Sequence, residues 1–292
     1  MAKVIVSCPG TCGELIQGYV EDEFRLVSCG INMFSVATIT SDQGAVNQAG
    51  EKSRKALEAT LADLEISSED EVKLSISSSL SVSKGMASST ADMAASIYAA
   101  SLYYKKPMTL EKIAGICTSI EATDSSFFNS LTMFDSRGAN FIEQTGWQPN
   151  FYVLMLEPKE ELNTESFHTK ANDELLKKQA KSFSRVHNLY RVAVKEKSLE
   201  KLGQAALKSA ELNQEILPKP FFETIVELSG TFNSCIGVNV AHSGTVIGIL
   251  LRDLTEVETI KRVLEDKQVT TYYQKLKVYS SCYKGLQQQK GG

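Results

Sequence analysis

The 292-residue sequence predicts an α+β protein that contains two domains. Segments with the period-two alternation of half-buried strands and segments with the apolar spacing of amphipathic helices occur in both halves of the chain. The turn-like stretch Gln148-Pro149-Asn150 separates the halves, and a fresh apolar run begins directly after it. We therefore expect an N-terminal domain at residues 1–149 and a C-terminal domain at residues 150–292.

The elements expected in the N-terminal half follow from side-chain spacing. Residues 72–78 alternate apolar and polar side chains, whereas the apolar side chains of residues 51–64 recur at helical spacing. A turn-rich segment at residues 8–13 is expected to end the first strand. On the same criteria we expect strands at residues 3–7, 24–28, 33–40, 72–78, 131–134 and 139–144, and helices at residues 51–64, 88–104 and 109–120.

The C-terminal half has the same mixed character. Strands are expected at residues 151–156, 235–240, 246–251 and 275–280, and helices at residues 173–194, 199–213 and 221–229. The polar, glycine-ended tail at residues 287–292 is expected to fray.

Composition narrows the class of protein. An apolar share of 42%, a charged share of 23% and a net charge of −4 are typical of a globular protein. The absence of an extended Lys/Arg block argues against a nucleic-acid partner. The start of the chain lacks the apolar core of a signal peptide, and no run is long enough to span a bilayer. We therefore expect a cytoplasmic protein without a membrane partner.

The most informative segment, residues 81–92 (Ser-Val-Ser-Lys-Gly-Met-Ala-Ser-Ser-Thr-Ala-Asp), lies between an expected strand and an alanine-rich helix. Free backbone N–H groups and the positive end of a helix suit a polyphosphate. An ordinary serine or threonine N-cap is the alternative interpretation. Neither Gly-x-x-x-x-Gly-Lys-Ser/Thr nor Gly-x-Gly-x-x-Gly occurs, which argues against P-loop and dinucleotide enzymes.

Four segments, in this order along the chain, resemble the GHMP small-molecule kinases. They are Pro9–Glu14 after the first strand, Gly85–Ala91, Glu121–Asp124 and Val240–Thr245. Within that family these strings are most similar to those of the L-threonine kinases. The resemblance implies a ribosomal-protein-S5-like α/β N-terminal domain and a ferredoxin-like α+β C-terminal domain. This sequence departs from the family pattern in two places. Ser81 stands where the family commonly has proline, and the third loop, Val240–Thr245, contains a single glycine where many members are glycine-rich.

The resemblance also implies a nucleotide site. Asp124 would be the base that accepts the proton of the acceptor hydroxyl, or the group that orients it; a local Asx-turn is the alternative. Mg²⁺ would be held by Ser89 and Glu121, although Glu121 could instead be a solvated charge at a helix end. The ATP phosphates would contact Lys84, Gly85, Met86, Ala87, Ser88, Ser89 and Thr90, although Lys84 could instead be an exposed loop lysine.

The acceptor would lie between the two domains. A lone arginine, Arg137, could pair with a carboxylate of the substrate, and His242 could either pack beneath the third loop or act in the site. The substrate-side residues implied by the resemblance are Thr11, Glu14, Ser243, Gly244 and Thr245.

The implied activity is ATP- and Mg²⁺-dependent phosphorylation of the L-threonine hydroxyl, which gives L-threonine O-3-phosphate and ADP for adenosylcobalamin synthesis and propanediol utilisation. The expected partners are ATP and a small amino-acid alcohol. Kinases of another small alcohol, such as homoserine or an isoprenoid precursor, and a non-catalytic nucleotide-binding sensor are the alternatives. The sequence leaves open whether the protein forms a homodimer.

Overall fold

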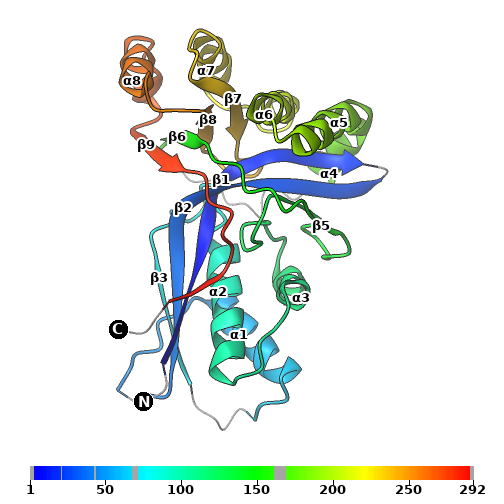
Figure 1. The fold of residues 1–292 in the computed structure, drawn as a ribbon, viewed down its shortest axis with the longest axis vertical. Coiled ribbons are helices and arrows are strands. Elements are labelled where there is room, and N and C mark those ends of the chain that lie inside the picture. The colour runs from blue at the N-terminus through cyan, green and yellow to red at the C-terminus, as the bar shows by residue number, and fades with distance from the viewer. Residues whose placement is uncertain (1–2, 21, 43, 68–71, 161–168, 290–292) are drawn as a thin grey trace.

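The computed structural model describes residues 3–20, 22–42, 44–67, 72–160 and 169–289, and its mixture of helices and strands confirms the α+β class (Figure 1). The helices are α1 (Glu51–Asp63), α2 (Ser88–Tyr103), α3 (Leu110–Ile120), α4 (Lys170–Lys178), α5 (Ala180–Glu196), α6 (Leu199–Asn213), α7 (Phe222–Ser229) and α8 (Val257–Asp266), with a 3-10 turn at Val269–Thr271. The strands are β1 (Lys3–Val20), β2 (Glu23–Thr40), β3 (Lys73–Ser78), β4 (Thr132–Phe134), β5 (Ile142–Gln144), β6 (Tyr152–Glu157), β7 (Cys235–Val240), β8 (Ile247–Leu251), β9 (Lys275–Ser280) and β10 (Gln287–Gln289).

The described strands form one sheet that both halves of the sequence share. Its order is β5-β4-β2-β1-β7-β8-β6-β9, with β3 beside β2 and β10 beside β1. β1 and β2 are 18 residues each and pair as a long antiparallel hairpin. Figure 1 shows this hairpin running up beside β3 and then bending to pass beneath α5 and α6.

The bend has a local cause in β1. The pairing with β2 shifts register between Pro9 and Gly10, between Thr11 and Glu14, and between Glu14 and Ile16. Such bulges bend a strand and increase its twist. The expectation that residues 8–13 end the first strand is therefore wrong, because these residues kink a strand that continues to Val20.

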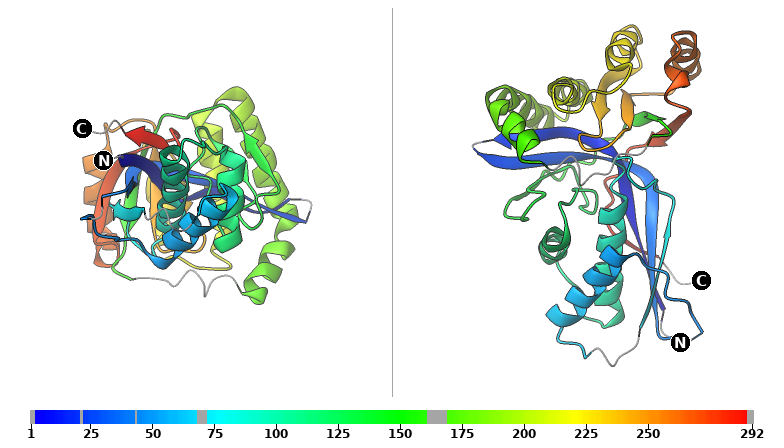
Figure 2. Two further views of the ribbon diagram at one scale, coloured as in Figure 1. Left: turned by 90° about the horizontal axis from the view of Figure 1, so that it is seen from below. Right: turned by 180° about the vertical axis from the view of Figure 1, so that it is seen from behind.

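Two helical layers cover different parts of the bent sheet. In the lower part of Figure 1, α1, α2 and α3 lie together, and the alanine-rich α2 packs on both β1 and β2. In the upper part, α5 and α6 pack on β1, and α6 also contacts β7. The reverse view in Figure 2 shows the same division, with the hairpin passing from one layer to the other.

The helix expected at residues 173–194 is two helices, α4 and α5, which meet at Gln179. The amide of Gln179 donates to the carbonyl of Leu212 and to the carboxylate of Glu215, each at 2.9 Å. The junction is therefore fixed by a tertiary contact with the end of α6, which the local pattern does not contain.

The C-terminal segment returns to the N-terminal half instead of fraying over its whole length. The N–H of Cys282 donates to the carbonyl of Gly30 at 2.9 Å. β10 then pairs antiparallel with the beginning of β1, with Gln287 opposite Ser7. Residues 290–292 of the expected tail lie outside the described residues.

The apolar side chains form two clusters. The larger one joins both halves of the sequence and includes Ile16, Phe134 and Phe183. The smaller one fills the space between the sheet and the outer helices, with Ile249 and Ile260 among its members. Among the described helices, none combines the length and the apolarity that crossing a membrane requires.

Two glycines set the distance between α6 and β7. A Cβ atom on Gly203 would clash with the carbonyl of Ile236, and one on Gly237 would clash with the backbone of Gly203. We expect Gly203→Ala to lower the free energy of unfolding by about 1–3 kcal/mol, because backbone would have to move. The control is Gly115→Ala in α3, where a methyl group meets open space. Its helix propensity should raise stability by about 0.5–1 kcal/mol. Urea unfolding measures both, and equal midpoints would contradict the packing argument.

Candidate active site

The loop before α2 is held by its carbonyl groups. The carbonyl of Met86 accepts from the N–H of Thr11 at 3.1 Å, and that of Gly85 accepts from the N–H of Gly13 at 3.0 Å. The carbonyl of Lys84 accepts from the N–H of Thr245 at 3.0 Å. Because β1 and the third loop, at residues 241–245, donate hydrogen bonds to these carbonyls, the loop before α2 is fixed on two sides.

The start of α2 has no side-chain cap. The residue at the N-cap position is Ala87, in the left-handed conformation with φ 53°, and no side chain hydrogen-bonds the first N–H groups. This geometry contradicts the ordinary N-cap interpretation of the serine-rich segment. A helix end with open N–H groups is instead suited to bind an anion.

These N–H groups open onto a cavity of about 560 Å³. It brings together most of the site residues expected from the sequence, and adds Lys52, Val82, Ser83, Ile120 and Ala122, which the sequence interpretation missed. The expected residues that line it are Glu14, Gly85, Met86, Ala87, Ser88, Ser89, Thr90, Glu121, Asp124 and Ser243.

Lys84 does not line this cavity. Its side chain is buried, and its ammonium donates to the carbonyls of Pro158 at 2.9 Å and Lys159 at 2.7 Å, and also to that of Glu160. The expected phosphate contact of this ammonium is therefore not supported, because the ammonium already donates its hydrogen bonds to the segment that follows β6.

Thr11, Gly244 and Thr245 also lie behind the cavity rather than in its lining. Thr11 and Thr245 hydrogen-bond the loop before α2 through their N–H groups, as described above. A Cβ atom on Gly244 would clash with the carbonyl of Lys84. These residues hold the loop before α2 in place and do not line the cavity, so their expected contact with the substrate stays a prediction.

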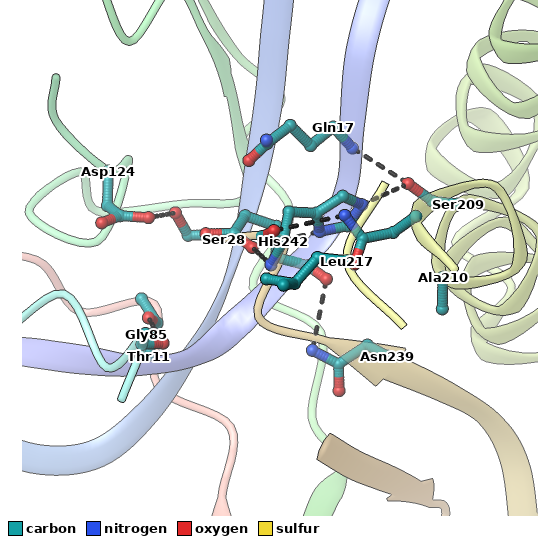
Figure 3. Close-up of polar contacts among 12 residues, drawn as sticks. Thr11, Gln17, Ser28, Gly85, Asp124, Ser209, Ala210, Leu217, Asn239 and His242 are labelled. Atoms are coloured by element: carbon teal, nitrogen blue, oxygen red, sulfur yellow. Dashed lines mark hydrogen bonds and ion pairs between the residues drawn. The ribbon is translucent and has the colours of Figure 1, made fainter. Parts of the chain in front are cut away.

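Asp124 follows α3 and faces the cavity. Its Oδ1 accepts from the hydroxyl of Ser28 on β2 at 3.2 Å, and its N–H donates to the hydroxyl of Thr90 on α2 at 3.2 Å. The Ser28 contact is visible in Figure 3. Ser28 thus orients the carboxyl and Thr90 holds the backbone of Asp124, so the residue is fixed by two other elements rather than by a local Asx-turn.

Glu14 is buried beside Asp124, and His242 orients it. Its Oε2 accepts from the N–H of His242 at 2.8 Å and lies 3.1 Å from Nδ1 of the same residue. The other ring nitrogen, Nε2, lies 3.0 Å from the hydroxyl of Ser209, which accepts from the N–H of Gln17 at 3.0 Å (Figure 3). These partners fit a ring that donates from Nδ1 and accepts at Nε2. His242 therefore has a positioning role beneath the third loop.

The surroundings of Asp124 disfavour its charged form. Burial raises the pKa of Asp124 well above its ordinary value, and the charge and hydrogen bonding of Glu14 raise it further, while the Ser28 hydrogen bond opposes them. The opposite happens to a lysine behind the pair: burial lowers the pKa of Lys219 to about 7, and the charge of Glu14 only partly offsets this. Nothing in the sequence singles out Lys219 as a neighbour of Glu14, because only the fold brings the two residues together.

Ser89 and Glu121 lie side by side at the cavity, close enough to bind one metal ion together. The hydroxyl of Ser89 donates to Oε1 of Glu121, and the ammonium of Lys52 pairs with Oε2. Among the described residues no group of three or more His, Cys, Asp or Glu could hold a metal. One hydroxyl and one carboxylate nevertheless fit Mg²⁺, which takes oxygen ligands and keeps water and substrate phosphates.

Arg137 belongs to a second cavity, of about 650 Å³, which shares Ala122 with the first. Its guanidinium donates to the carboxylate of Asp173 at 2.7 Å and to the hydroxyl of Tyr19 at 2.8 Å. The expected pairing with a substrate carboxylate would have to compete with this ion pair.

The raised pKa of Asp124 makes a prediction about stability. The folded state holds a proton that the unfolded state releases, so this carboxyl makes stability fall as the pH rises through the folded pKa. Asp124→Asn has no proton to lose and should remove that fall. Its melting temperature should be close to that of the wild type near pH 4 and about 2–4 °C higher at about pH 8. An offset that does not change with pH would contradict the prediction.

Comparison with known proteins agrees with this geometry. Residues 51–131 match the model of the GHMP kinase N-terminal domain. The chain is 34% identical over 274 residues to an L-threonine kinase of Citrobacter freundii, covering 92% of this chain and 94% of the relative. It is 33% identical to an L-threonine kinase of Salmonella typhimurium, covering 93% and 91% of the two chains.

The fold is similar to that of solved kinases. Homoserine kinase from Cytophaga hutchinsonii superimposes with a TM-score of 0.72 at 11% identity, covering 99% of this chain and 98% of that structure. The uncapped start of α2, the oriented aspartate beside it and relatives that cover nearly the whole chain lead to one conclusion. The chain belongs to the GHMP kinases, in the family that includes these L-threonine kinases.

Proposed function

We propose that this protein transfers the γ-phosphoryl group of ATP to the side-chain hydroxyl of L-threonine, giving L-threonine O-3-phosphate and ADP. The observation that carries the proposal is the position of Asp124: its carboxyl faces the same cavity as the uncapped start of α2. The similarity to curated L-threonine kinases supports the choice of acceptor.

In this proposal the phosphates of ATP lie at the N-terminus of α2. The N–H groups of the first turn and the helix dipole favour negative charge there. Ser88, Ser89 and Thr90 add hydroxyl groups along the same wall of the cavity. Ser89 and Glu121 would hold Mg²⁺, which when bound neutralises phosphate charge and supports the transfer.

The pair of acids suits an acceptor that carries an ammonium group next to its hydroxyl. L-Threonine has these groups on adjacent carbons, so Asp124 can receive the hydroxyl while Glu14 receives the ammonium. The cation beside Glu14 would offset the charge that raises the pKa of Asp124. Binding of the substrate would thereby favour the ionised form of Asp124 that the reaction needs.

The transfer is then a single displacement. The hydroxyl oxygen forms a bond to the γ-phosphorus, its proton moves to Asp124, and the bond from phosphorus to the ADP oxygen breaks. We further propose that the reaction takes place in the cytoplasm. We also propose that its product is used for adenosylcobalamin synthesis, which supports propanediol utilisation.

The first experiment is an ADP-release assay with L-threonine, L-serine, homoserine and mevalonate. L-Threonine should give the highest kcat/KM. Asp124→Ala should lower kcat by about 100-fold or more, because it removes the group that receives the proton. A preference for homoserine or mevalonate would establish another small-alcohol kinase, and no turnover with any alcohol would favour a nucleotide sensor. Undiminished turnover in Asp124→Ala would remove that residue from its role.

A second experiment tests the ammonium contact of Glu14. Wild-type enzyme should prefer L-threonine to 3-hydroxybutyrate, which lacks the ammonium group. Glu14→Gln keeps the size of the side chain but loses its charge, and should reduce this preference at least about tenfold through the KM for L-threonine. The ratio of the two kcat/KM values is unaffected by partial loss of folded protein. An unchanged ratio would exclude the contact.

A further inference from the structure

Lys52 is the cationic side chain closest to the proposed metal carboxylate. It is the second residue of α1, and α1 packs beside the end of α3, where Glu121 lies. The ammonium pairs with Oε2 of Glu121, while Oε1 accepts from the hydroxyl of Ser89. Both oxygens of Glu121 therefore have protein partners that a bound metal ion would have to replace.

The charge in the cavity makes this cation important. Its described lining carries three carboxyl groups, those of Glu14, Glu121 and Asp124, and a single cationic side chain, that of Lys52. A nucleoside triphosphate brings several more negative charges to the same space. The ammonium of Lys84 is committed to backbone carbonyls. Within the described residues, Lys52 is thus the side chain of the lining that can offset phosphate charge.

The ion pair of Lys52 is well suited to exchange its partner. The side chain of Lys52 is 40% exposed and that of Glu121 is 19% exposed. Solvent screens such a pair, so its net contribution is small and breaking it costs little. A lysine also has a flexible four-carbon stem, which lets its ammonium follow a nearby anion.

We propose that Lys52 is a phosphate-binding residue that exchanges partners. Without Mg²⁺ and nucleotide, its ammonium neutralises Glu121. When Glu121 holds Mg²⁺, the ammonium would be released from the carboxylate and would bind the phosphates of the nucleotide. The inference rests on the proposed function only in requiring a nucleotide in this cavity.

The test compares Lys52→Met with Lys55→Met. Lys55 lies one turn later on α1, and its pair with Glu51 at 2.7 Å is on the surface, with 57% of the lysine side chain exposed. Binding of AMPPCP, a non-hydrolysable ATP analogue, is measured by calorimetry with excess Mg²⁺. Lys52→Met should weaken binding about tenfold, the loss of one charge-assisted contact. Lys55→Met should bind as the wild type does.

A second measurement separates partner exchange from a merely structural role. In EDTA, Glu121→Gln frees Lys52 and should tighten AMPPCP binding at least about threefold. The double variant Lys52→Met/Glu121→Gln should show a clearly smaller gain over Lys52→Met alone. Equal gains in the two backgrounds would overturn the exchange, as would wild-type affinity of Lys52→Met with Mg²⁺.

Failure of this inference differs from failure of the proposed function. A wild-type protein that binds no AMPPCP would refute the nucleotide site itself. A wild-type protein that binds AMPPCP and phosphorylates L-threonine, with Lys52→Met unchanged in affinity, would refute only the role of Lys52. Melting temperatures of all variants, measured in parallel, show whether each is folded.

Discussion

The backbone contact between the loop before α2 and the loop at residues 241–245 is the constraint on which the site depends. Gly85 and Gly244 face each other so closely that a Cβ on Gly85 would clash with Ala241 and one on Gly244 with Lys84. The carbonyl groups of the loop before α2 accept hydrogen bonds from the loop at residues 241–245 and from β1. Because carbonyls face inward, the loop can present N–H groups to the cavity, which is what an anion site requires.

A buried polar network extends this constraint to the acid pair. The amide of Asn239 on β7 donates to the carbonyls of Cys12 and Glu14, which flank a bulge of β1. His242 then fixes the carboxylate that the bulge directs inward. Two carboxyls in such a place are costly, since desolvation disfavours their charge. Their retention is understandable if a cationic group of the substrate completes the arrangement.

The sequence alone predicted the fold class, most elements and the identity of the main cavity residues. The elements were predicted from local signals such as the side-chain spacing in residues 72–78. The cavity residues were predicted from the serine-rich segment at the start of α2 and from the resemblance of four segments to the GHMP kinases. The failures depend on tertiary contacts. The kink of β1 is set by its partner β2, and the break at Gln179 is set by α6. Lys84 looked like a phosphate ligand by sequence position, but its ammonium lies against the end of β6. Lys52 carried no signal, because only the packing of α1 against α3 brings it to the site.

The path of the last residues has a consequence for how the chain reaches its final form. β10 pairs with one edge of β1 near the beginning of that strand, and the N–H of Cys282 donates to the carbonyl of Gly30. During synthesis on the ribosome, β1 therefore keeps an open edge until β10 has emerged. Contacts between residues so far apart in sequence form slowly. Until they form, that edge can pair with another chain. The N-terminal half is consequently completed only after β10 has been synthesised, so a product truncated before β10 would leave this edge of β1 exposed even though every residue of the proposed catalytic cavity is present.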